Sequence, residues 1–191
     1  MVCPARFIPA LVLLCLTAFV QSGHSQSVLY DNGPDAETGY YQVNFGASTA
    51  DSFILPHAAA VSNFALTLYC VDDRNWPQQI RWTITTQPYG GTVLGTGVTP
   101  LNRLQPPYLT RFLFFAWDVG FQIPPLDLPA GTYWIQLQNV NTRWLTLAYW
   151  AEGTGTSMAY YDPAGSGTNG AVQRAASESF SVMGAWANAA P

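Results

Sequence analysis

Residues 61–71 read VSNFALTLYCV, and this run decides the fold class. From Phe64 onward every second side chain is apolar, and Phe64, Leu66, Leu68 and Cys70 would share one face of an extended chain. Alternation with a period of two is typical of a half-buried β-strand, because successive side chains of a strand point to opposite faces. We therefore predict a strand here, with these four side chains in the core.

Similar short runs, rich in β-branched and aromatic residues, follow one another along the rest of the chain. The other predicted strands are Val28–Asp31, Tyr40–Phe45, Ala50–Leu55, Gln79–Thr86, Thr92–Gly97, Leu109–Trp117, Thr132–Asn139, Trp144–Ala151, Met158–Tyr161 and Glu178–Gly184. Turns are expected where Gly, Pro, Asn and Asp cluster, as at Pro124-Pro125, and Ala171–Ser177 could form one helical turn. The pattern predicts an all-β protein, a single-domain antiparallel β-sandwich whose strand number favours a jelly-roll-like arrangement.

The same alternation extends the predicted core to two further strands. The additional core residues are Ile80, Trp82, Ile84, Tyr133, Ile135 and Leu137. Cys70 is the one cysteine after the N-terminal segment, so no intramolecular disulfide is expected, and we interpret it as a small buried side chain. Residues 153–170, rich in Gly, Ser and Thr, are predicted to form loops around one short strand.

The first 25 residues have the layout of a secretory signal peptide. Arg6 supplies a positive charge, Phe7–Val20 is almost wholly apolar, and small polar residues follow. The apolar run is shorter than the roughly 20 residues that span a bilayer. We expect cleavage after Ser25, with Ser22 and Ser27 as alternatives, which divides the chain into a signal peptide (1–25) and a β-sandwich domain (26–191). The protein is thus predicted to be secreted, to a periplasmic or extracellular location.

The net charge of the chain after cleavage argues against some classes of binding partner. After cleavage six Arg stand against eleven Asp and Glu, and the chain contains no Lys. An acidic surface without basic clusters disfavours nucleic acid and anionic membrane as partners.

Three segments carry a resemblance to a family. They are Tyr30-Asp31-Asn32-Gly33-Pro34, Ala50-Asp51-Ser52-Phe53 and Leu128-Pro129-Ala130-Gly131-Thr132-Tyr133-Trp134. In these the chain resembles secreted bacterial jelly-roll-like β-sandwich proteins of the PEP-CTERM-associated type, which are mostly uncharacterised. Ser52 stands where the family has an acidic residue, and the sorting tail is absent. The resemblance implies the sandwich fold and transfers no catalytic residues.

Residues for catalysis or metal binding are sparse. His57 is the sole histidine after residue 25 and follows a proline, so we interpret it as a solvated turn residue; a zinc site would need more His and Cys ligands. Carboxylates such as Asp118, Asp127, Glu152 and Glu178 are interpreted as separate and facing water, although a paired arrangement would permit glycoside cleavage.

Calcium is the one metal for which the chain offers candidate ligands. Asp72, Asp73 and Asn75 could supply carboxylate and amide oxygens to a structural calcium ion, but the spacing of a calcium-binding loop is missing. No other cofactor is expected.

The aromatic residues suggest a binding face. In the predicted strand 132–139, Trp134 shares the polar face with Gln136 and Gln138, opposite the core residues. Trp144 and Trp150 share a face of the next strand, which we expect to pair with 132–139 as a hairpin and so to place the Trp side chains together. Arg81 lies on the polar face of strand 79–86. Indole rings, amides and a guanidinium suit a carbohydrate, while the alternative is that loops cover this face and the Trp residues are packing.

These observations favour a secreted, non-catalytic module that binds polysaccharide or another extracellular ligand through its Trp, Gln and Arg face. The alternative is a structural protein of the cell surface or matrix, and a glycan-cleaving enzyme is a third possibility. A cluster of exposed Trp side chains would favour binding, and two carboxylates across a cleft would favour the enzyme.

Overall fold

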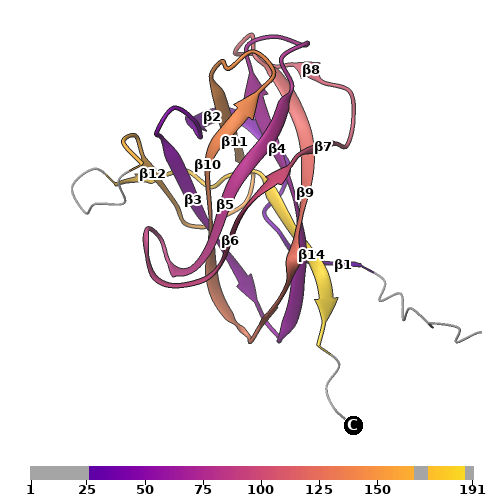
Figure 1. Cartoon of the computed structure of the whole chain (residues 1–191), viewed down its shortest axis with the longest axis vertical. Helices are drawn as coiled ribbons and strands as arrows, with labels where there is room; N and C mark the ends of the chain where they lie inside the picture. Colours follow the sequence, from indigo (N-terminus) through magenta and orange to yellow (C-terminus); the bar gives the residue numbers. More distant parts are fainter. Residues whose placement is uncertain (1–25, 166–171, 188–191) are drawn as a thin grey trace, which may run out of the picture.

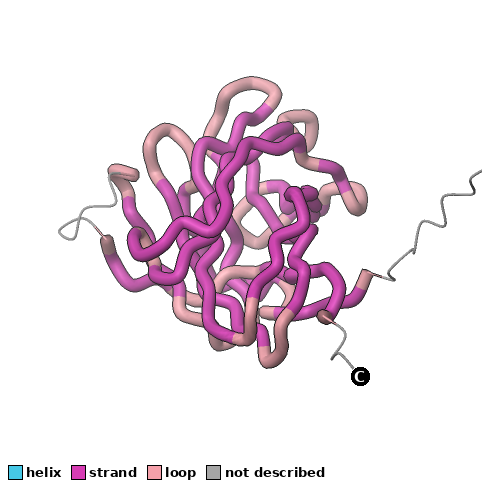
Figure 2. The backbone as a smooth tube through the Cα atoms, turned by 60° about the horizontal axis from the view of Figure 1, so that its bottom comes forward, coloured by secondary structure: helices cyan, strands magenta, loops and turns pink. Residues whose placement is uncertain are grey.

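Strands separated by turns and loops make up the structure, a computed structural model that describes residues 26–165 and 172–187 (Figures 1 and 2). The predicted signal peptide, 1–25, lies outside this part. The strands are β1 (Ser27–Asp31), β2 (Asp35–Gln42), β3 (Ser48–Leu55), β4 (Ala59–Cys70), β5 (Pro77–Gln87), β6 (Gly90–Pro100), β7 (Asn102–Arg103), β8 (Tyr108–Leu109), β9 (Phe115–Leu128), β10 (Gly131–Thr142), β11 (Ala148–Gly153), β12 (Ala159–Asp162), β13 (Gln173–Ala175) and β14 (Phe180–Trp186). Within the described ranges no helix is long and apolar enough to cross a membrane.

The strands form two antiparallel sheets that pack face to face, so the predicted β-sandwich is confirmed. One sheet has the order β2-β11-β4-β9, with β14 also beside β4, β1 beside β14, and the short β7 and β8 beside β9. The other has the order β13-β12-β3-β10-β5-β6. From β2 to β11 the chain crosses between the sheets at each connection except the β5–β6 hairpin and the connections among β7, β8 and β9 (Figure 1). The strands β2–β6 and β9–β11 thus form the jelly roll of eight strands. Strands β7 and β8 are added beside the edge strand β9, β12 and β13 beside the edge strand β3, and β14, followed by β1, beside β4.

The core lies between the sheets and contains all the residues predicted for it. Phe64, Leu66, Leu68, Cys70, Ile80, Trp82, Ile84, Tyr133, Ile135 and Leu137 are all buried. Burial also raises the pKa of the Cys70 thiol to about 12, so this side chain is an unreactive part of the core.

Two prolines expected in a turn lie instead within β9. Pro124 and Pro125 fall where the register between β4 and β9 shifts, between the pairs Val61–Leu126 and Asn63–Gln122. A proline has no N–H to donate and is therefore tolerated at such an irregularity. The predicted turn is wrong because both prolines are accommodated at a β-bulge within β9.

Two predicted strands begin too early, for one shared reason. Residues 110–113 (TRFL) and 142–145 (TRWL) each form a tight turn before β9 and β11. In each turn the leucine N–H donates to the threonine carbonyl, Leu113 to Thr110 and Leu145 to Thr142, both at 3.1 Å. Both leucines have positive φ, 63° and 53°, which ends the extended conformation. The helical turn considered for 171–177 is also wrong, since residues 173–175 form β13.

The outer face of the eight-stranded sheet carries a second, smaller aromatic cluster. Tyr69 of β4 is fully buried there, under Tyr40, Phe112, Phe114 and Tyr149. Segment 101–114, which includes β7 and β8, thus covers part of this face. A pocket opens on the same face beside the cluster.

Candidate functional site

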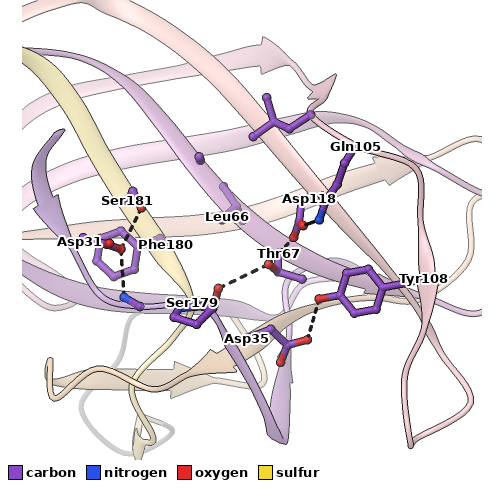
Figure 3. Close-up of a pocket in the computed structure, with 14 residues that line it drawn as sticks. Asp31, Asp35, Leu66, Thr67, Gln105, Tyr108, Asp118, Ser179, Phe180 and Ser181 are labelled. Carbon is purple, nitrogen blue, oxygen red and sulfur yellow. Dashed lines mark hydrogen bonds between the residues drawn. The ribbon is translucent and has the colours of Figure 1, made fainter. Parts of the chain in front are cut away.

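A pocket of about 610 Å³ opens on the outer face of the eight-stranded sheet. Its floor is formed by residues 65–67 of β4, and its sides by the end of β1, the start of β14 and segment 104–108 (Figure 3). The polar lining residues are Asp31, Asp35, Thr67, Gln105, Tyr108, Asp118, Ser179 and Ser181. Alternation along β4 explains the floor, because Thr67 points outward between the core residues Leu66 and Leu68.

Asp118 of β9 is held in place by two neighbours. The hydroxyl of Thr67 donates to its Oδ1 at 2.6 Å, and the amide of Gln105 donates to its Oδ2. Thr67 and Asp118 are paired across β4 and β9, so the sheet register itself brings them together. Ser179 extends this chain of hydrogen bonds, since its hydroxyl donates to Thr67 Oγ1 at 3.4 Å.

The other two carboxylates are also oriented by donors. Asp31 Oδ1 accepts the hydroxyl of Ser181 and the backbone N–H of Gly33, each at 3.0 Å. Asp35 accepts the hydroxyl of the buried Tyr69 at 2.6 Å and that of Tyr108 at 3.2 Å. Gly33 has a φ of +80°, a conformation that lets the chain turn between these two aspartates.

The electrostatics of the pocket are negative. Three aspartates and no basic residue line it. The pKa of Tyr108 is raised by burial and by the charges of Asp35 and Asp118, so its hydroxyl stays protonated and can donate. Because Tyr108 as a residue is 37% exposed, the pocket combines hydrogen-bonding groups with an accessible aromatic residue.

The predicted binding face is present in part, on the opposite side of the molecule. Gln138 of β10 pairs with Arg81 of β5, and Gln136 pairs with Thr83. Trp134 follows on the same outer face of the six-stranded sheet, where it pairs with Thr85. Four of the six predicted residues, Trp134, Gln136, Gln138 and Arg81, therefore do share one face.

The tryptophan of that face is less accessible than predicted. Trp134 is only partly exposed, and its indole N–H is buried with no hydrogen-bond partner among the described residues. Tyr89, in the β5–β6 hairpin, donates its hydroxyl to the carbonyl of Ser48 at 2.6 Å and reaches that of Tyr160 at 3.2 Å. The hairpin thus leans over β3 and β12, and this face offers polar groups beside a partly exposed ring.

The expectation that Trp150 belongs to the face is wrong. Trp150 is 0% exposed, and its indole N–H donates to the carbonyl of Ser179 at 2.9 Å. The expected hairpin is also absent, because β10 and β11 belong to different sheets. Trp144 is 48% exposed, but it lies in the 142–145 turn at the end of the sandwich, under Arg143.

The three residues considered as calcium ligands interact with other groups of the protein in this structure. Asn75 is buried, its carbonyl oxygen accepts the N–H of Trp144 at 2.8 Å, and its amide donates to Thr146. Asp72 accepts the N–H of Arg74 at 2.8 Å, and Asp73 pairs with the Arg74 side chain. In this structure Asn75 therefore ties two loops together, and calcium at this loop stays a prediction without a converging ligand set.

The carboxylates interpreted as separate and facing water differ from one another. Asp127 is exposed as predicted and Asp118 is partly exposed in the pocket, whereas for Glu178 the interpretation is wrong, because it is fully buried and bridges to Glu152. His57 is an exposed turn residue as predicted. The pocket aspartates could have been suspected from the cluster 31–35 and from the outward positions of Thr67 and Asp118. That Thr67 and Asp118 are neighbours, however, follows only from the register between β4 and β9.

Comparison with known proteins adds no identification. No protein-family model matches the chain, and a search of curated proteins finds no matching relative. The resemblance to PEP-CTERM-associated proteins therefore stays a prediction.

Proposed function

We propose that this protein is a secreted, non-catalytic binding module and that its ligand is a neutral polysaccharide held in the pocket on the eight-stranded sheet. The observation that carries the proposal is the convergence of oriented carboxylates, hydroxyls and the Tyr108 ring on one open pocket. Secretion rests on the sequence of the first 25 residues.

The chemistry of the lining favours a ligand rich in hydroxyl groups. Carboxylates accept hydrogen bonds from sugar hydroxyls, and Gln105, Thr67 and the serines can both donate and accept. The exposed ring of Tyr108 offers a flat apolar surface for the C–H face of a sugar. Three aspartates without a basic neighbour disfavour phosphate, nucleic acid and acidic polysaccharides.

The pocket is organised before a ligand arrives. Asp31, Asp35 and Asp118 each accept at least two hydrogen bonds from neighbouring groups, so their oxygens are already fixed in direction. Groups that need no reordering lose little entropy on binding, which favours affinity. The outer face of the six-stranded sheet is the less suitable site because Trp134 is only partly exposed and its indole N–H is buried.

A binding experiment with matched variants tests this assignment. The mature chain is screened by affinity electrophoresis in gels that contain soluble β-glucan, xylan, mannan or, as the acidic comparison, pectin. For the polysaccharide that retards the protein, Tyr108→Ala and Asp118→Asn should each weaken binding about tenfold or more, through loss of a stacking ring or of a charged acceptor. Asp127→Asn, an exposed carboxylate on the same strand, and Gln138→Ala, on the opposite face, should bind as the wild type does.

The outcomes separate the competing functions. Loss of binding in Gln138→Ala with full binding in Tyr108→Ala would move the site to the six-stranded sheet. Release of new reducing ends that Asp118→Asn abolishes would instead identify a glycan-cleaving enzyme. Retardation by none of the four polysaccharides, with self-association of the pure chain, would contradict the proposal and favour the structural role.

A further inference from the structure

Four connections between strands lie together at one end of the sandwich, the end where β8 is found in Figure 1. In one sheet, Cys70 at the end of β4 pairs with Ala148 at the start of β11 and with Phe115 at the start of β9. Val43 joins the two sheets here, because its N–H donates to the carbonyl of Ala148 and its carbonyl accepts the N–H of Val140, each at 3.0 Å. These connections, which we call the tip loops, are residues 43–47, 71–76, 110–114 and 143–147.

The three most exposed large apolar residues of the described chain lie in the tip loops. Leu113, Leu145 and Phe45 are 76%, 70% and 63% exposed, and Trp144 is exposed beside Leu145. Phe45 and Leu145 also line one hollow of about 280 Å³, so two of the tip loops adjoin. Single exposed apolar side chains are ordinary on a protein surface, whereas a group of them at one place indicates contact with an apolar partner.

The same three residues have an unusual backbone conformation. Phe45, Leu113 and Leu145 have φ values of 52°, 63° and 53°. This left-handed region is unfavourable for residues with a bulky side chain, and glycine or asparagine is the usual choice there. An apolar side chain at each of these turns therefore costs stability and gains no burial. Such strain at three turns of one end points to a function for the exposed side chains.

Positive charge is concentrated beside these side chains. Three of the six arginines that follow residue 25 lie in the tip loops and are exposed, namely Arg74, Arg111 and Arg143. The guanidinium of Arg111 lies 4.8 Å from the centre of the Phe112 ring, and that of Arg143 lies 5.9 Å from the centre of the Trp144 ring. The sequences TRFL and TRWL thus each combine a cation, an aromatic ring and an exposed leucine in one tip loop.

Nearby carboxylates leave two of these arginines without a counter-charge. Asp73 pairs with Arg74 at 3.7 Å, and Glu37 accepts only the backbone N–H of Arg111, at 3.0 Å. No described carboxylate forms an ion pair with the guanidinium of Arg111 or Arg143. These two cations are therefore available to an anionic group outside the chain.

We propose that the tip loops bind the surface of a lipid membrane, independently of the polysaccharide pocket. Phe45, Leu113 and Leu145 enter the boundary between headgroups and acyl chains, where apolar side chains leave water. Trp144 lies at the level of the headgroups, which amphipathic aromatic rings favour. Arg111 and Arg143 face the lipid phosphates.

A second copy of this chain is the less suitable partner. Contact between two copies through the tip loops would bring the unpaired guanidinium groups of Arg111 and Arg143 from both sides together, whereas lipid phosphates have the opposite charge. The total charge of the mature chain predicts against an anionic membrane. Charges act over only about 10 Å at 0.1 M salt, however, so the arginines at the contact have more effect than distant carboxylates.

Cosedimentation of the mature chain with vesicles tests the proposal. The vesicles contain four parts phosphatidylcholine and one part phosphatidylglycerol. Leu113→Asn combined with Leu145→Asn should weaken binding about tenfold or more but should not lower Tm, because asparagine tolerates the left-handed conformation. Arg111→Gln combined with Arg143→Gln should also weaken binding about tenfold.

A matched control removes two apolar side chains that are exposed away from the tip loops. Ile54→Thr combined with Val93→Thr, at strand positions of β3 and β6, should bind vesicles as the wild type does. Absence of cosedimentation in the wild type would overturn the proposal, and so would equal binding by the wild type and the double asparagine variant. Dimerisation in analytical ultracentrifugation that this variant abolishes, without vesicle binding, would overturn it too and assign the tip loops to contact between copies.

Discussion

The carboxylate of Asp51 accepts the backbone N–H of Glu178 at 2.7 Å and so joins strand β3 of one sheet to the segment that leads into β14 of the other. Asp51 comes early in the chain, and Glu178 is near its end, 127 residues later. The bond crosses the sandwich near the Glu152–Glu178 bridge, where β11 meets this segment. Closure of the fold at its C-terminus therefore depends on buried polar groups as well as on apolar packing.

We predict that the protein loses stability as the pH rises from about 5 to 8. The folded-state pKa of Asp51, about 7, and that of Glu178 lie above their unfolded values, so the folded chain binds more protons in this interval. The free energy of unfolding must then decrease with pH, by about 2–3 kcal/mol between pH 5 and 8 if Asp51 alone titrates. Urea midpoints at several pH values measure the slope, which Asp51→Asn should reduce and Asp127→Asn should not. A stability that increases over this range would contradict the assignment.

Asn32→Ala should destabilise the protein by about 2–3 kcal/mol, because it removes the donor to Ser157, Ser177 and the carbonyl of Glu178 and leaves a buried acceptor unpaired. Chemical denaturation at pH 6 measures the change. Asn102→Ala, at an exposed position in β7, is the matched control and should lie within about 0.5 kcal/mol of the wild type. Similar small effects at both positions would show that the network is dispensable.

Two tryptophans should respond differently to removal of the side chain. Trp150→Ala empties a fully buried position and loses the bond to Ser179, so we expect a loss of about 3–5 kcal/mol. Trp144→Ala removes a half-exposed ring from a turn and should cost less than about 1 kcal/mol. The urea midpoints of the two variants measure these losses of stability. A small loss in Trp150→Ala would contradict the placement of Trp150 in the core.

Alanine substitutions at two glycines, Gly184 and Gly90, provide a further pair of matched variants. A Cβ atom at Gly184 would lie 2.0 Å from the carbonyl oxygen of Ala60, so Gly184→Ala should destabilise by about 3 kcal/mol or more. A Cβ atom at Gly90 meets no atom within 4 Å, and Gly90→Ala should stabilise by about 0.4–1 kcal/mol through reduced freedom of the unfolded chain. Thermal unfolding compares the two. Retention of the wild-type Tm by Gly184→Ala would mean that β14 lies farther from β4 than described.

The candidate pocket was harder to predict than the core. Thr67 and Asp118 occupy outward positions on their strands, which alternation alone indicates, but only the β4–β9 register makes them neighbours. Asp35 and Tyr108 meet because segment 101–114 folds back over the outer face of the sheet. Local pattern contains no information about such long-range pairings.

Strand β11 shows why Trp150 was predicted to lie on the wrong face of its strand. Both of its faces are apolar, since Trp150 packs in the main core and Tyr149 packs in the outer cluster with Tyr40 and Phe114. A strand covered on both sides has no polar face to indicate its orientation. The choice between Trp150 inward and Tyr149 inward therefore depended on the sheet that β11 joins.

The amino-acid sequence by itself determined the sandwich class, most of the strands and the inward residues of β4, β5 and β10, because alternation between apolar and polar side chains is a local property of a half-buried strand. The tertiary structure alone decided which strands pair, that β10 and β11 lie in different sheets, and that Asp51 and Glu178 meet in the interior. These pairings depend on contacts between residues far apart in the chain. The energies of such contacts come from the packing of complete sheets, so no short segment of sequence indicates them.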